Sequence, residues 1–156
     1  MTEKSDITDS SSLEAYRSER IGRLLLRSSR IFEEIVLQHL KEHGFRDIRS
    51  VHLNFLGSLS VEGSRSTEIA QLINSPKQGV GQLAKELEKL GYVSSVPDPK
   101  DGRARIIKFT GKGKKLARQI PNVLEETEAD FSSIVGKKQL AQVKSTLTKL
   151  IAAKAK

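Results

Sequence analysis

The chain has 156 residues, of which 37% are hydrophobic and 29% charged. This composition is typical of one globular domain, or of a small domain with an oligomerisation extension. The chain contains no Cys, so disulfides, thiolate catalysis, thiol-based redox sensing and Cys-ligated zinc are excluded. No stretch approaches the ~18 consecutive apolar residues of a membrane span, and the polar N-terminus lacks the apolar core of a secretory signal. We therefore expect a cytoplasmic protein with no membrane partner.

The net charge of +8 is concentrated in one segment. Residues 76–118 contain eleven Lys and Arg against four Asp and Glu, a local charge of +7 that leaves +1 for the rest of the chain. A local excess of this kind is expected in a protein that binds a polyanion such as a nucleic acid. A solvated basic face is the alternative.

The first predicted helix is long. Residues 1–10 are expected to be a disordered tail, and Ser11 and Glu14 then have the capping-box spacing of a helix start. The helix is predicted to continue to about His43, with Gly44 as its C-cap. Apolar residues recur along it at helical spacing, at Ile21, Leu24, Leu25, Ile31, Phe32, Ile35, Val36 and Leu40. A helix of about 30 residues is ~45 Å long, more than a compact domain of this size covers, so we expect this stripe to be a dimer interface.

Two shorter helices come next. Asp47 is predicted to cap a helix over residues 48–60, and a further helix is predicted over residues 66–73. Asn74 follows, and we expect a sharp turn there because Asn tolerates the left-handed backbone conformation better than most residues.

The next helix is predicted over residues 76–90, with Ser75 as N-cap and Pro76 at the first helical position. Its apolar residues share one face, while the opposite face carries Lys77, Gln78, Gly79, Gln82, Lys85 and Lys89. Lys and Gln suit the edges and phosphates of a DNA major groove, and Gly79 lets the backbone come close. An ordinary amphipathic helix with a solvated face is the alternative.

Ala70, Asn74 and Val80 have the offsets of a helix-turn-helix, in which a small residue, a left-handed residue and a β-branched residue allow two helices to pack across each other. A β-hairpin is predicted after it, with residues 92–96 and 105–109 as strands and turn-forming residues between them. The carboxylate of Asp101 could hold Arg103 extended at the tip, as a minor groove would require. A surface ion pair without function is the alternative.

The C-terminal part is predicted to be helical. Thr110 is the expected cap of a helix that begins at residues 111–114, Pro121 is a possible kink, and Gly136 separates a final helix.

The runs VGQLAKELEKLGYV and DPKDGRARIIKFTGKGKKL resemble the signature of the multiple-antibiotic-resistance regulator (MarR) family of winged-helix transcription factors. The resemblance covers about residues 13–152. It implies a mainly α fold with a small β-hairpin, in which a winged helix-turn-helix domain over residues 46–115 is flanked by dimerisation helices over residues 11–45 and 116–156. The departures are mild: Asn74 and Ser75 replace a commoner Gly and aliphatic residue, and Pro76 is unusual.

The resemblance also implies a function: a homodimeric, ligand-responsive repressor that binds a pseudo-palindromic operator in double-stranded DNA. The helix over residues 76–90 would enter the major groove and Arg103 the minor groove, with Asp101 positioning the wing. The candidate DNA contacts are Ser64, Arg65, Ser66, Lys77, Gln78, Gly79, Gln82, Lys85, Lys100, Arg103 and Arg105.

Many relatives are released from DNA by small aromatic acids bound between the dimerisation and DNA-binding parts. By resemblance, the candidate lining of such a pocket here is His39, His43, Arg49 and His52. The alternative is that these residues cap helices or form hydrogen bonds between helices.

An enzyme is not expected. The chain has three His, no Cys, no phosphate-binding glycine motif and no metal-ligand spacing, so neither a catalytic residue nor a cofactor is predicted. A winged helix used as an adaptor for protein contacts is the remaining alternative, and it predicts a less basic surface with no need for Arg103.

Overall fold

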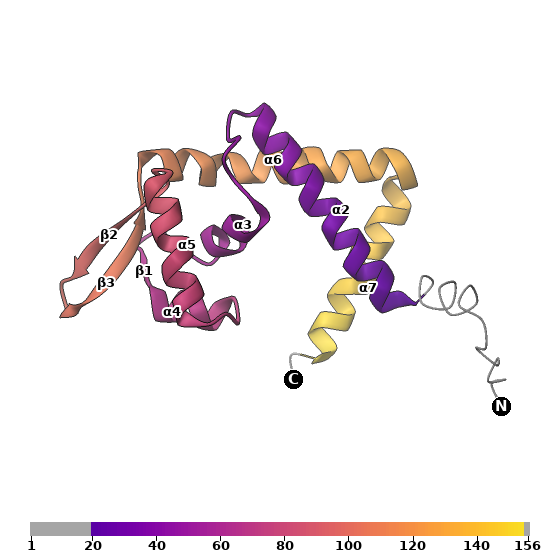
Figure 1. The fold of residues 1–156 in the computed structure, drawn as a ribbon. Coiled ribbons are helices and arrows are strands. Elements are labelled where there is room, and N and C mark those ends of the chain that lie inside the picture. The colour runs from indigo at the N-terminus through magenta and orange to yellow at the C-terminus, as the bar shows by residue number, and fades with distance from the viewer. Residues whose placement is uncertain (1–19, 155–156) are drawn as a thin grey trace, which may run out of the picture. The chain divides into compact units, whose positions relative to one another are not determined.

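The computed structural model describes residues 20–154, except for the side chains at positions 102 and 103. The chain divides into two units, Met1–Ile35 and Val36–Lys156, and the buried core lies in the second. The predicted tail and the predicted helix start at Ser11 lie outside the described residues. The elements, labelled in Figure 1, are α2 (Ile21–Glu42), α3 (Ser50–Gly57), β1 (Ser64–Arg65), α4 (Ser66–Leu72), α5 (Lys77–Lys89), β2 (Val93–Asp98), β3 (Asp101–Phe109), α6 (Gly111–Val135) and α7 (Lys137–Lys154).

Helix α2 ends where the sequence predicts. Gly44 adopts a φ of +91°, and the backbone N–H of Phe45 donates to the carbonyl of Leu40 at 2.8 Å. A left-handed residue after the last turn, with a hydrogen bond back across it, is a common helix end.

The predicted start of the second helix is wrong. Helix α3 begins at Ser50, and Arg49 occupies the N-cap position that we assigned two residues earlier to Asp47. The Asp47 carboxylate instead accepts hydrogen bonds from the Tyr92 hydroxyl and from Lys112 Nζ, the latter at 2.9 Å. Although partial burial opposes ionisation, these two hydrogen bonds hold the pKa of Asp47 below its ordinary value.

The turn between α4 and α5 confirms the predicted left-handed conformation of Asn74 but not the predicted N-cap role of Ser75. Asn74 has a φ of +48°, as predicted. The N–H groups of Asn74 and Ser75 donate to Gln71 and Ala70 at 3.3 and 3.0 Å, which is the Schellman pattern at the end of α4. The Ser75 N–H therefore belongs to the end of α4, and the prediction of Ser75 as the N-cap of α5 is wrong. Pro76 occupies that position, with φ −58° and ψ 137°, and α5 begins at Lys77.

The predicted hairpin is confirmed, with longer strands than expected. Strands β2 and β3 are antiparallel, with Val93 opposite Phe109, and a bulge lies between Pro97 and Asp98. In Figure 1 they project beside α5. The two-residue strand β1 pairs with β3, with Ser64 opposite Ile107, and gives the sheet order β1-β3-β2. Sequence reasoning missed β1, because two residues are too few to show an alternating pattern.

Helix α6 starts as predicted, directly after the hairpin. The Thr110 side chain accepts a hydrogen bond from the Gly113 N–H at 3.1 Å. The helix continues through Pro121, and Gly136, with a φ of +87°, separates it from α7. The core contains Phe55, Leu56, Ile69, Val80, Leu87, Tyr92, Val93, Ile107, Leu116 and Val123. Within residues 20–154, no helix has the length and apolar character needed to span a bilayer.

Candidate nucleic-acid interface

Helix α5 has a buried face and an exposed polar face. Val80 and Leu87, two turns apart, have no exposed surface and fix the helix against the core. The face on the other side carries the exposed side chains of Lys77, Gln78, Gln82 and Lys85. Gly79 is half-buried, and a Cβ added there would come no nearer than 3.8 Å to the Ser75 hydroxyl oxygen. The packing of the protein therefore does not itself require a glycine at this position.

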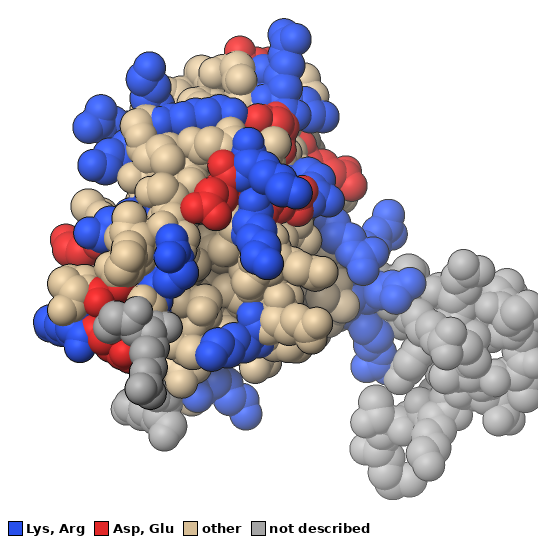
Figure 2. Space-filling model, turned by 60° about the vertical axis from the view of Figure 1, so that its left-hand side comes forward, with Lys and Arg blue, Asp and Glu red and all other residues tan. Residues whose placement is uncertain are grey.

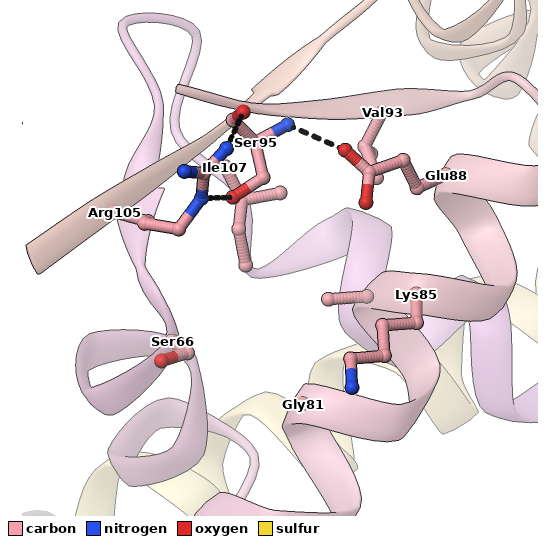
Figure 3. A pocket seen from close by; sticks show the side chains of 9 residues that line it. Ser66, Gly81, Lys85, Glu88, Val93, Ser95, Arg105 and Ile107 are labelled. Atoms are coloured by element: carbon pink, nitrogen blue, oxygen red, sulfur yellow. Dashed lines mark hydrogen bonds between the residues drawn. The ribbon is translucent and has the colours of Figure 1, made fainter. Parts of the chain in front are cut away.

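The wing and α5 enclose a groove with a volume of about 400 Å³ (Figure 3). Arg105 of β3 lies along one side, where its Nε donates to the Ser95 hydroxyl at 2.8 Å. The Ser95 N–H in turn donates to Glu88 of α5 at 2.9 Å. This chain of hydrogen bonds ties both wing strands to α5, and Lys85 lines the same groove.

A second groove, of about 390 Å³, gathers residues that are far apart in the sequence. Its lining includes Arg65 and Ser66 from β1 and the start of α4, Lys77 from the start of α5, and Arg105 from the wing. Figure 2, which brings the wing side of the molecule forward, shows Lys and Arg predominating over Asp and Glu on this view. The structure therefore brings predicted contact residues from the helices and the wing onto one basic surface.

Arg65 is part of an ion pair that sequence reasoning did not find. Its Nε donates to Asp98 at 2.7 Å, and a second guanidinium nitrogen contacts the same carboxylate. The other Asp98 oxygen accepts the Lys100 N–H at 2.8 Å. The Asp98 side chain is only 4% exposed, against 38% for Arg65. The Lys100 N–H and the Arg65 guanidinium together hold the pKa of Asp98 below its ordinary value.

The remaining predicted contacts differ in accessibility. Ser64 is buried, and its hydroxyl oxygen accepts the Ser60 N–H at 3.1 Å. Ser66 is half-buried, whereas Lys100 and Asp101 at the wing tip are exposed. The Arg103 side chain lies outside the described part of the structure, so its predicted place in a minor groove stays a prediction, as does the positioning role of Asp101.

The four predicted effector residues form two pairs with different partners. His39 Nε2 donates to Asp130 of α6 at 2.8 Å, and His43 Nε2 donates to Glu126 at 3.0 Å. The hydrogen bond that His39 donates to Asp130 raises the pKa of His39; burial opposes this only in part, and Glu42 reinforces it. Across positions 20–154, no group of three or more His, Asp or Glu is arranged to hold a metal ion.

Arg49 and His52 make the second pair, at the start of α3. His52 is fully buried, and its Nδ1 accepts the Arg49 N–H at 3.2 Å. Its Nε2 lies 3.3 Å from the Arg49 guanidinium and 3.5 Å from Glu86 of α5. The Arg49 guanidinium also contacts Glu86. These four residues make the contacts that the alternative interpretation predicts: they cap a helix or form hydrogen bonds between helices. Their role in binding an effector stays a prediction.

Comparison with known proteins finds one similar family. Residues 46–104 match the MarR family. The structure is similar to the reduced form of MarR from Escherichia coli, with a TM-score of 0.76 and 18% sequence identity over 84% of this chain and 96% of that one. The family match covers the helix-turn-helix and the first part of the wing, and the wider structural similarity shows a MarR-like fold. MarR-family regulators are non-enzymatic, which agrees with the prediction that this chain is not an enzyme.

Other MarR-like structures share the fold. The transcriptional regulator Tm0710 of Thermotoga maritima has a TM-score of 0.58 at 25% identity, and CouR of Rhodococcus jostii RHA1, bound to p-coumaroyl-CoA, has 0.64 at 23%. Each match covers 85% of this chain and 92% of the other. An uncharacterised protein of Archaeoglobus fulgidus is 36% identical over 62 residues, which is 40% of this chain. The match spans 62% of that relative, less than two thirds of its length. Members of the MarR family bind DNA as dimers, and some bind small effectors.

Proposed function

We propose that the protein is a sequence-specific, double-stranded DNA-binding transcription regulator that acts in the cytoplasm as a homodimeric repressor. The observation that carries this proposal is the basic surface made by α5 and the wing in a MarR-family fold. The buried face of α5 fixes the helix, while Lys77, Gln78, Gln82 and Lys85 extend from its exposed face. A helix held in this way can enter a major groove without rearranging the core.

The DNA contacts that we propose fall into two groups. On α5, the amide groups of Gln78 and Gln82 suit base edges, and the ammonium groups of Lys77 and Lys85 suit phosphates. Because packing does not require Gly79, we assign that glycine to close approach of the DNA backbone. At the wing, Arg103 enters the minor groove and Lys100 contacts phosphate. Ser64 of β1 and Ser66, the first residue of α4, belong to the same proposed site, and Arg105 contributes charge from its position against Ser95.

We propose that the helices on either side of residues 46–115 form the dimer, from residues 11–45 and 116–156. Support comes from apolar surface that the described monomer leaves exposed. None of the residues Lys137–Lys154 is buried, although this helix carries the apolar side chains Val143, Leu150 and Ile151. Helix α2 exposes Ile21, Leu24, Leu25, Leu26 and Ile31. Two copies joined through such helices would hold two α5 helices against half-sites about one turn of DNA apart.

We propose a small aromatic acid as the effector that releases the DNA. The support is indirect: CouR, a structural relative, was solved with p-coumaroyl-CoA, the thioester of an aromatic acid. In this chain the candidate lining residues are engaged, His39 and His43 with α6 and Arg49 and His52 with α5. An acid bound at either pair would have to replace Glu126 or Glu86 as the partner of a basic side chain. Release of a bound operator by salicylate or a cinnamate would test this assignment.

Selection of bound sequences from a random DNA pool tests the proposed function. We expect an enriched pseudo-palindrome whose half-sites are about 10 base pairs apart, and affinity that falls steeply as salt rises because phosphate contacts release counterions. A protein-contact adaptor would enrich no sequence. A reporter placed behind the selected site then tests repression, with increased transcription as the result that contradicts it.

A further inference from the structure

The ion pair between Arg65 and Asp98 connects the two edges of the wing sheet. Arg65 lies on β1 and Asp98 ends β2, with β3 between them. Strands in a sheet are about 4.8 Å apart, so the side chains of Arg65 and Asp98 together bridge ~10 Å across β3. The pair therefore joins two elements that share no backbone hydrogen bonds with each other.

Each member of the pair is also fixed to a neighbouring element. Arg65 is the N-cap residue of α4, and its backbone N–H donates to Glu68 in the first turn at 2.8 Å. Asp98 accepts the Lys100 N–H, so the same carboxylate shapes the turn at the wing tip. The contact thus links the first helix of the helix-turn-helix to the wing tip.

We propose that Arg65 and Asp98 form a positioning pair that fixes the wing tip relative to the helix-turn-helix, and that Arg65 supports DNA binding through Asp98 rather than by contacting DNA. Two observations favour this role over a phosphate contact. The guanidinium already has a carboxylate partner that is 4% exposed, and a buried carboxylate left without its cation is costly. Two guanidinium nitrogens also contact the same Asp98 oxygen, which restricts how the guanidinium can be oriented against the carboxylate. The inference rests on the proposed function, because it assigns a role within DNA binding.

The two possible roles of Arg65 predict opposite effects of removing Asp98. If Arg65 contacts DNA, Asp98→Ala frees a cation and removes an anion near the phosphates, so DNA binding should strengthen. If the pair positions the wing, Asp98→Ala releases the wing as Arg65→Ala does, so both variants should weaken binding. The double variant should then bind no worse than either single variant, because both substitutions remove the same constraint.

The experiment measures binding of the full-length protein to the DNA selected from the random pool, across a range of salt concentrations. We expect Arg65→Ala and Asp98→Ala each to weaken binding about 10-fold, with the double variant equal to the singles and all salt slopes unchanged. Glu62→Ala is the matched control, because it removes an exposed carboxylate just before β1 and leaves the pair intact. It should not weaken binding. Stronger binding by Asp98→Ala, or a salt slope reduced by about one in Arg65→Ala, would overturn the proposal.

Hydrogen exchange of the free protein tests the pair without DNA. In Arg65→Ala we expect faster exchange of the Lys100 amide and its neighbours at the tip, with α5 amides as in the wild type; circular dichroism confirms that the variant is folded. Unchanged exchange at Lys100 would contradict the positioning role. If the wild-type protein binds no DNA, the proposed function fails, whereas the exchange result still decides whether the pair holds the wing.

Discussion

Replacing Gly113 with Ala should strongly destabilise the protein, since the joint between the wing and α6 has no room for a methyl group. An added Cβ would lie 2.0 Å from the Tyr92 carbonyl oxygen and 2.9 Å from Phe109 Cδ1. The oxygen is backbone and cannot rotate away. The same oxygen accepts hydrogen bonds from the N–H and hydroxyl of Thr110, at 3.0 and 3.1 Å, so any movement that relieves the overlap disturbs them.

The expected cost can be worked from these contacts. Forcing an extra methyl group into a packed site costs about 1–3 kcal/mol, and weakening the two hydrogen bonds to Tyr92 adds roughly 1 kcal/mol each. The greater helix propensity of Ala offsets about 1 kcal/mol of this destabilisation. We therefore expect Gly113→Ala to lower the free energy of unfolding by about 2–4 kcal/mol, a large share of the ~5–15 kcal/mol typical of a folded domain.

Urea unfolding followed by circular dichroism measures this change, with wild type and variants at one protein concentration because association contributes to apparent stability. Gly111→Ala is the matched control: it lies in the same turn of α6, and an added Cβ there meets no atom within 4 Å. We expect it to be neutral or to stabilise by up to about 1 kcal/mol. A Gly113→Ala protein within about 1 kcal/mol of the wild type would refute the reasoning.

Three further substitutions test the interface, the dimer and the pH response. Arg103→Ala should weaken binding to the selected DNA by about 10- to 100-fold with an unchanged melting temperature; equal affinity would remove the wing assignment. Ile151→Asp places a charge on the exposed face of α7 and should give a folded monomer by sedimentation, whereas an intact dimer would contradict the proposed interface. The pKa of His39 is raised, so its contribution to stability is complete below about pH 6.5 and is lost as pH rises through the folded-state pKa. His39→Gln should flatten this decline in unfolding free energy, and an identical pH profile in both proteins would exclude the Asp130 contact as its cause.

The parts of the fold that were predictable from sequence are those that local patterns encode. Apolar spacing located the helices, Asn74 marked the turn of the helix-turn-helix, and Thr110 marked the start of α6. These signals depend on neighbours within one or two helical turns. The error at Ser75 arose at the same scale: the N-cap of α5 lies one residue later, at Pro76, and the Ser75 N–H donates to the end of α4.

The contacts that escaped prediction join residues far apart in the chain. Arg65 and Asp98 are 33 positions apart, and Asp47 is 45 positions from Tyr92 and 65 from Lys112. Each of these carboxylates has a plausible local role, as a helix cap or a turn residue. Which role it takes depends on the cation or hydroxyl that the tertiary fold places nearby, and no periodicity along the chain contains that information.

The one-residue connection between the wing and α6 limits where this protein can change length. Only Thr110 separates the end of β3 at Phe109 from the start of α6 at Gly111. One residue inserted there would rotate α6 by ~100° about its axis and carry its buried side chains, Leu116 and Val123 among them, away from the core. At the other end of the hairpin, insertion lengthens only the turn at Pro99 and Lys100. Changes in length should therefore be tolerated at the wing tip but not between β3 and α6.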